Sequence, residues 1–119
     1  MLLALFSSIV VAQAVAQDNS EQQLKQEVIA SVDAQADALT DLSDRIWSFA
    51  EIAFRESESA EALIEHAAAH GFAITRNVGG IPTAFVAEYG SGDPVIGIMG
   101  EFDALPGLSQ AAVPERSPI

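Results

Sequence analysis

The chain has 119 residues, half of them apolar, so it can hold one small domain at most. Its 17 acidic and 5 basic residues give a net charge of −12, which argues against nucleic acid and anionic membranes as partners because both need a basic footprint. The chain has no cysteine, which excludes disulfides and thiolate metal sites.

Residues 1–16 have the character of a secretory signal. They are mostly apolar and end in Ala14-Val15-Ala16, a small-x-small pattern typical of a cleavage site, so they predict a secreted or periplasmic protein that starts at Gln17. The run is shorter than the roughly 20 residues that a stable membrane span needs. Because no Lys or Arg precedes Lys25, an N-terminal anchor or a misassigned start, which would leave the protein cytoplasmic, stays open.

A long amphipathic segment follows, without Gly or Pro from Ser20 to Ser57. Apolar residues recur in it every three or four positions: Leu24, Val28, Val32, Ala36, Leu39, Leu42, Ile46, Phe49 and Ala53. This period predicts one long helix, or two helices with a break near Thr40.

Ser57 is predicted to cap a further helix that ends at Gly71. His66 and His70 lie four residues apart on it, a spacing that helical metal ligands share. Their position at the C-terminal end of the helix, where partial positive charge is favourable, is the preferred interpretation.

The second half of the chain predicts strands. Residues 72–78 and 83–89 are rich in β-formers and are separated by Gly79-Gly80, which favours a turn. The unbroken apolar run Val95–Met99 predicts a central strand that is buried on both faces. The expected fold class is therefore α/β, with two helices followed by a three-stranded meander.

Two carboxylates, Glu101 and Asp103, follow the end of the predicted central strand. On an extended chain, residues two apart point the same way, with Cα atoms about 6.5 Å apart. Ligands of open α/β sheets bind outside the carboxyl ends of strands, so this pair is a candidate metal or acid/base site. Spacing alone favours a solvated acidic loop.

Several strings between about Leu42 and Gln110 resemble one enzyme family: Gly79-Gly80-Ile81-Pro82-Thr83-Ala84-Phe85-Val86, Gly90-Ser91-Gly92 and Gly100-Glu101-Phe102-Asp103-Ala104-Leu105-Pro106-Gly107-Leu108-Ser109-Gln110. The family is that of the metal-dependent amidohydrolases and peptidases, which includes carboxypeptidase G, aminoacylases and indole-acetyl-amino-acid hydrolases. The string from Asp103 to Gln110 is the specific part. The family's Gly-His-x-Cys-Gly-His segment is not in the chain, and Ala50 replaces a family proline, which would let the preceding helix continue.

The resemblance implies the N-terminal part of a zinc-exopeptidase-like catalytic domain over residues 17–110, followed by a disordered tail over 111–119. It implies metal-dependent hydrolysis of an amide bond in an N-acyl or aminobenzoyl amino acid, a small-molecule substrate, with zinc or manganese as cofactor. Asp103 carries over as catalytic residue and metal ligand, or as the partner of a ligand, and Glu101 stands where the wider family often has a ligating His.

At full length the resemblance implies a homodimer or hetero-oligomer. The 119-residue fragment itself is expected to be inactive, with most metal ligands outside it. The alternative is a non-catalytic secreted helical interaction fragment, or the product of a truncated gene.

Overall fold

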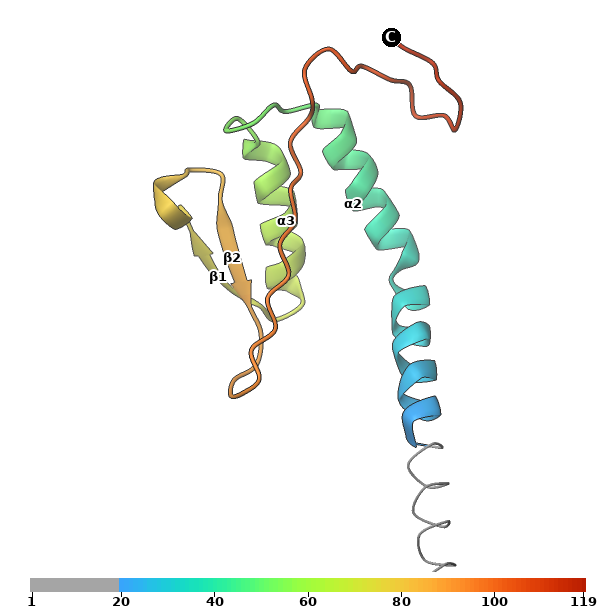
Figure 1. The fold of residues 1–119 in the computed structure, drawn as a ribbon, viewed down its shortest axis with the longest axis vertical. Coiled ribbons are helices and arrows are strands. Elements are labelled where there is room, and N and C mark those ends of the chain that lie inside the picture. The colour runs from blue at the N-terminus through green and yellow to red at the C-terminus, as the bar shows by residue number, and fades with distance from the viewer. Residues whose placement is uncertain (1–19) are drawn as a thin grey trace, which may run out of the picture. The chain divides into compact units, whose positions relative to one another are not determined.

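The computed structural model describes residues 20–119, which Figure 1 shows in colour. The chain divides after Thr40 into two compact units. The predicted signal, 1–16, lies outside the described residues. No helix within the described residues is long and apolar enough to cross a membrane.

The helical segment has a break, as one of the two predictions expected, but at a different place. A first helix covers residues 20–34, a turn falls at Gln35, and α2 follows over Ala36–Phe49. The amide of Gln35 donates to Val32 O, three residues back, at 3.0 Å, and this tighter turn separates the helices. The apolar side chains of the first helix are exposed, Leu24 and Val28 by 61% each.

Helix α2 ends at Phe49, so the expectation that it continues through Ala50 is wrong. Ala50 has a φ of 50°, in the left-handed region that commonly ends a helix. Beyond it, the amide of Ala104 donates to Glu51 O at 2.7 Å, and Ile52 forms a parallel bridge with Ala104. These contacts with a distant segment require the chain to leave the helix.

Helix α3 covers Ser57–Ala69 and ends in a glycine-based cap, as predicted. The amide of Gly71 donates to Ala68 O at 3.0 Å and that of Phe72 to Ala67 O at 3.1 Å, which is the Schellman pattern. Gly71 has a φ of 85°, which suits glycine. Ser57 is the first helical residue rather than the cap, so that prediction is wrong.

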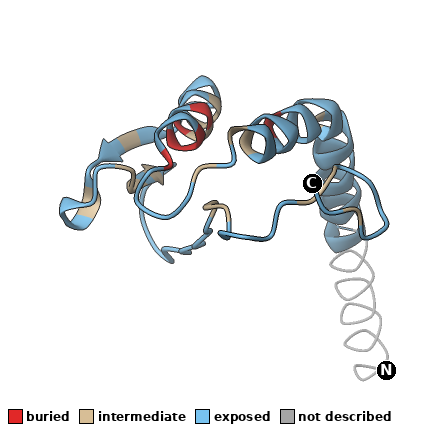
Figure 2. Cartoon of the chain, turned by 90° about the horizontal axis from the view of Figure 1, so that it is seen from above, coloured by how far each residue is buried: buried red, intermediate tan, exposed pale blue. Residues whose placement is uncertain are grey.

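The small core lies mainly on α3. Its buried residues are Ser59, Ala60, Ala62 and Ile64, and α2 adds Leu42 (Figure 2). A β-hairpin packs against α3 (Figure 1). Its strands are β1 (Ala73–Arg76) and β2 (Phe85–Glu88), joined through a short 3-10 turn, η1 (Val78–Gly80).

The hairpin is antiparallel, with Ala73 opposite Glu88 and Arg76 opposite Phe85. It is tied to α3 by a two-pronged ion pair, in which the Arg76 guanidinium donates to both Glu61 carboxylate oxygens at 2.7 and 2.8 Å. The predicted turn at Gly79-Gly80 is confirmed, and both glycines have positive φ, 64° and 77°.

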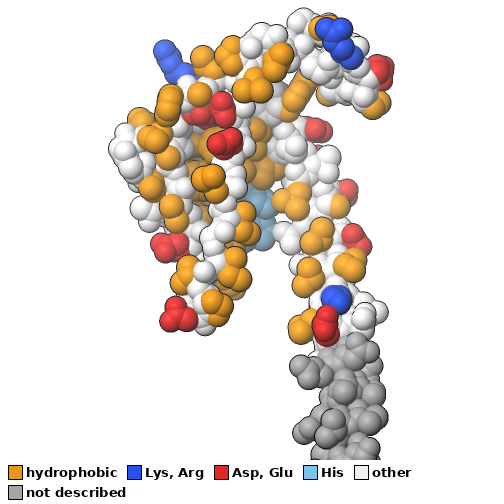
Figure 3. Space-filling model, viewed as in Figure 1, with side chains coloured by type: hydrophobic (Ala, Val, Ile, Leu, Met, Phe, Trp, Pro, Cys, Tyr) orange, Lys and Arg blue, Asp and Glu red, His pale blue; other side chains and the backbone are white. Residues whose placement is uncertain are grey.

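The mixed helix-and-strand class is confirmed, but the described residues contain two paired strands and not a three-stranded meander. Residues 95–99 have no regular structure, and their side chains are exposed by 84% at Val95, 82% at Ile96, 95% at Ile98 and 89% at Met99. A central strand needs partners on both sides, and β2 pairs only with β1 here. Hydrophobic side chains accordingly lie at the surface in Figure 3.

Candidate functional site

The two predicted site residues lie in different environments. Asp103 is half-buried, whereas Glu101 is exposed. Both neighbours of Asp103 contact other parts of the chain. The centroid of the Phe102 ring lies 6.3 Å from that of the Phe85 ring in β2, and the Ala104 amide donates a hydrogen bond to Glu51 O. The structure therefore fixes the backbone on either side of Asp103.

The described residues do not fit a complete metal centre. No group of three or more His, Asp or Glu side chains gathers anywhere in residues 20–119. His66 and His70 lie together at the end of α3, with ring centroids 4.4 Å apart and His70 Nδ1 2.8 Å from His66 O. That contact holds His70 at the C-terminal end of the helix, as the sequence predicted. The metal-binding role of Asp103 and Glu101 stays a prediction.

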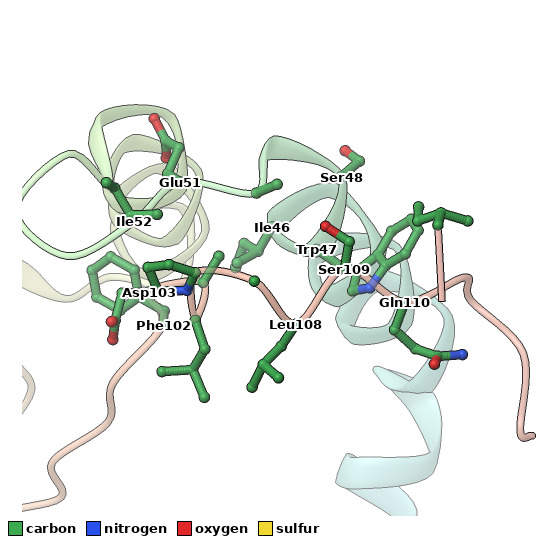
Figure 4. A pocket seen from close by; sticks show the side chains of 16 residues that line it. Ile46, Trp47, Ser48, Glu51, Ile52, Phe102, Asp103, Leu108, Ser109 and Gln110 are labelled. Carbon is green, nitrogen blue, oxygen red and sulfur yellow. The ribbon is translucent and has the colours of Figure 1, made fainter. Parts of the chain in front are cut away.

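A pocket of about 630 Å³ lies beside Asp103, within the size range of small-molecule sites. Figure 4 shows Phe102 and Asp103 at one end and Trp47, Ser109 and Gln110 at the other. The lining is mainly apolar and comes from the end of α2, from the loop that follows it and from the segment after Glu101. Its residues are Ile46, Trp47, Ser48, Ala50, Glu51, Ile52, Phe102, Asp103, Ala104, Leu105, Pro106, Gly107, Leu108, Ser109, Gln110 and Ile119.

The Gln110 amide braces one end of this pocket. Its Nε2 donates to Glu115 O at 3.0 Å, and its Oε1 accepts from the amide of Ser117 at 2.9 Å. Gln110 also forms an antiparallel bridge with Pro118. These hydrogen bonds fold residues 110–118 into a loop that turns back on itself. The domain boundaries expected from the sequence, with a tail over 111–119, stay predictions.

Sequence reasoning missed Glu51, whose carboxylate caps α3. Its Oε1 accepts from the Glu58 amide at 3.0 Å, and its Oε2 accepts from the Ser59 amide and hydroxyl at 2.8 Å each. Desolvation raises the pKa of this carboxyl, but the bonds from Glu58 and Ser59 outweigh it, so the pKa lies below its ordinary value. The cap comes from seven and eight residues upstream, beyond the local capping motifs that a sequence reveals.

Glu56 is a second carboxylate that the sequence did not single out, and it is buried, with 9% of its surface exposed. Its Oε1 accepts from the Phe54 amide and its Oε2 from the Thr83 hydroxyl, both at 2.8 Å. Burial raises the pKa of Glu56, and the hydrogen bonds, including those from Thr83 and Phe54, bring it below its ordinary value. Glu56 thus links the loop before α3 to the turn that precedes β2.

Comparison with known proteins found that the chain is similar to part of a hydrolase subunit. Over 82 residues the chain is 49% identical to one of the subunits of the p-aminobenzoyl-glutamate hydrolase of Escherichia coli (strain K12). The match covers 69% of this chain but only 17% of that relative, so the chain corresponds to a small part of it. The predicted likeness to an enzyme of aminobenzoyl amino acids is confirmed by this relative, whereas the metal dependence that the resemblance implies stays a prediction. No family model matches the chain, and no solved structure matches it.

Proposed function

We propose that this chain is part of a hydrolase that cleaves the amide bond of p-aminobenzoyl-glutamate or a related N-acyl amino acid. The observation that carries the proposal is the 49% identity over 82 residues with a polypeptide of the p-aminobenzoyl-glutamate hydrolase. The pocket beside Asp103 supports it, because a mainly apolar lining with a carboxylate at one end suits an aromatic acyl group joined to a polar amino acid.

Asp103 is the residue of this chain that we place at the reaction centre, either as a ligand of a divalent zinc or manganese ion or as the partner that orients a ligand. Glu101 is the second candidate ligand. Because residues 20–119 do not gather three metal-binding side chains, the remaining ligands are to be sought elsewhere in the protein.

The exposed apolar run 95–99 supports the finer fold proposal of a zinc-exopeptidase-like domain. Four side chains at least 82% exposed are costly to leave in water, at about 25 cal/mol per Å² of apolar surface. We place this run as a central strand of a larger sheet, with partner strands from other parts of the protein.

The relative is named as one subunit of its enzyme, which favours a hetero-oligomer over a homodimer for the full-length protein. We further propose export, since Ala14-Val15-Ala16 has the small-x-small pattern of a cleavage site.

The test is turnover by the protein expressed at the full length that its gene encodes. Release of p-aminobenzoate from p-aminobenzoyl-glutamate is followed, then repeated after chelator treatment and after return of zinc or manganese. Activity that is lost with chelator and restored by metal supports both proposals, and chelator-resistant activity rejects the metal.

A second candidate is a non-catalytic interaction fragment, favoured by the exposed apolar side chains of helix 20–34. No turnover of any N-acyl glutamate, alone or with copurifying chains, would favour this candidate over the hydrolase.

A further inference from the structure

The segment that carries Asp103 is attached at both of its neighbours. On one side the Phe102 ring contacts Phe85 of the hairpin, with centroids 6.3 Å apart and planes inclined by 43°. On the other side the Ala104 amide donates to Glu51 O at 2.7 Å, at the short end of the range for backbone hydrogen bonds. Asp103 stands between these attachments, so the backbone that carries its carboxylate is held on both sides.

Glu51 is itself held from two directions. Its carboxylate accepts three hydrogen bonds from Glu58 and Ser59 at the start of α3, and its carbonyl accepts the bond from Ala104. Ser59 is 1% exposed, so this attachment lies at the part of α3 that is most fully buried. One residue therefore connects the rigid end of a helix to the backbone beside Asp103.

The backbone before Glu51 shows that its placement is enforced. Ala50 adopts a φ of 50°, a conformation that costs a non-glycine residue free energy. The turn brings residue 51 to both α3 and Ala104, and these contacts offset the cost. A residue that served only to end α2 would not need a carboxylate directed at α3.

We infer that Glu51 is a positioning residue, which sets the place of the Asp103 carboxylate by joining Ala104 to the N-terminal end of α3. The expected effect of Glu51 on turnover rests on the proposed function, whereas its expected effect on the backbone at Ala104 does not. A helix cap alone would stabilise α3 and leave Ala104 unaffected.

The inference is tested by replacing Glu51 with Gln in the protein at the full length that its gene encodes. The amide keeps the shape of the side chain but loses its charge and one of the two acceptor oxygens. The matched control is Glu58→Gln, the same change in the first turn of α3 at a side chain that is exposed. Amide hydrogen exchange by mass spectrometry is read in the peptide containing Ala104 and in that containing Ser59.

For Glu51→Gln, exchange at Ala104 is expected to rise together with exchange at Ser59, and kcat to fall about 10-fold or more with a smaller change in KM, as for a displaced catalytic group. Glu58→Gln should leave exchange at Ala104 and kcat unchanged. Faster exchange at Ser59 with unchanged exchange at Ala104 would overturn the inference, leaving Glu51 as a cap only.

A milder variant, Ser59→Ala, covers the case in which Glu51→Gln does not fold. It removes one hydroxyl donor to Glu51 Oε2 and leaves the two backbone donors in place. Exchange at Ala104 should still rise together with exchange in the first turn of α3. Unchanged exchange at Ala104 would reject the inference. If the unmodified protein has no turnover, the proposed function fails while the exchange result still decides the role of Glu51.

Discussion

At the scale of single residues, the two acidic side chains after the apolar run make distinct predictions. Asp103 is half-buried between two held neighbours, whereas Glu101 is exposed. In the full-length protein, Asp103→Asn should lower turnover or metal affinity by about 10–100-fold if Asp103 orients a ligand, and by more if it is a ligand. Glu101→Gln should cost less.

For Asp103→Asn and Glu101→Gln, turnover is measured as hydrolysis of p-aminobenzoyl-glutamate, and bound metal is measured by elemental analysis. If Glu101→Gln loses both while Asp103→Asn keeps them, the wrong carboxylate was assigned. If neither variant differs from the unmodified protein, the pair is an ordinary acidic loop.

Glu51 and Glu56 predict an acid-sensitive fold. Both have a pKa below the ordinary value of about 4.3 because the carboxylate accepts hydrogen bonds. A lowered folded-state pKa contributes stability above the unfolded pKa, and this contribution is lost as pH falls through the folded-state pKa. The free energy of unfolding should therefore drop below about pH 4.3.

The measurement is denaturant unfolding between neutral and acidic pH, followed by Trp47 fluorescence. Glu51→Gln should be less stable at neutral pH, by about 0.5–2 kcal/mol as for a lost helix cap, and should show a shallower pH dependence. Glu58→Gln serves as control and should keep the original dependence. An equal slope in all three proteins would contradict the assignment.

The site residues differ in whether the sequence could predict them, because some depend on neighbouring residues and others on contacts with distant ones. Asp103 could be singled out from sequence because the specific string around it follows an apolar run. Glu56 could not, because its bond with Thr83 spans 27 residues and no local spacing rule connects them. The connection from Glu51 to Ala104 depends on the folded path of the chain in the same way.

At the scale of elements, the end of α2 gives a prediction for stability. Ala50 occupies the left-handed region with a φ of 50°, which glycine adopts without a Cβ penalty and proline cannot adopt. Ala50→Gly should raise the free energy of unfolding by up to about 1 kcal/mol, less the entropy that glycine adds to the unfolded chain. Ala50→Pro should lower it.

Both variants are compared by thermal unfolding, with Ala53→Gly as a control in the exposed loop. The family pattern has proline at position 50. If Ala50→Pro stabilised the protein, residue 50 could not have a positive φ, and the chain would leave α2 by a different turn.

Elements were predictable where local chemistry decides them. The period of apolar residues indicated the helices, and Gly71, Gly79 and Gly80 marked the ends and the turn that the structure confirms. The strand expected at Val95–Met99 depends on neighbours, because an apolar run becomes a strand only when other strands satisfy its backbone. The end of α2 likewise follows from the contact with Ala104, which no local pattern contains.

At the scale of the whole molecule, the 119-residue chain by itself should be inactive and should bind no stoichiometric zinc. Residues 20–119 gather no group of three metal-binding side chains, and a lone carboxylate holds a divalent ion weakly in water. Elemental analysis of the purified chain, with a turnover assay on the same sample, checks this. One bound zinc per chain after dialysis would contradict it.

Export is the last prediction at this scale, and it rests on the sequence of residues 1–16. An apolar run that ends in Ala14-Val15-Ala16 meets the small-residue requirement of signal cleavage, so the mature protein should begin at Gln17. No Lys or Arg precedes Lys25, so either the amino terminus alone supplies the positive charge of the signal or the true start lies upstream. Intact-mass analysis of the exported and cytoplasmic fractions distinguishes the mature from the full chain. Ala16→Trp should block cleavage while Ala4→Leu, in the apolar run, should not. Retention of Met1 in a protein found only in the cytoplasm would show that these residues are not a signal.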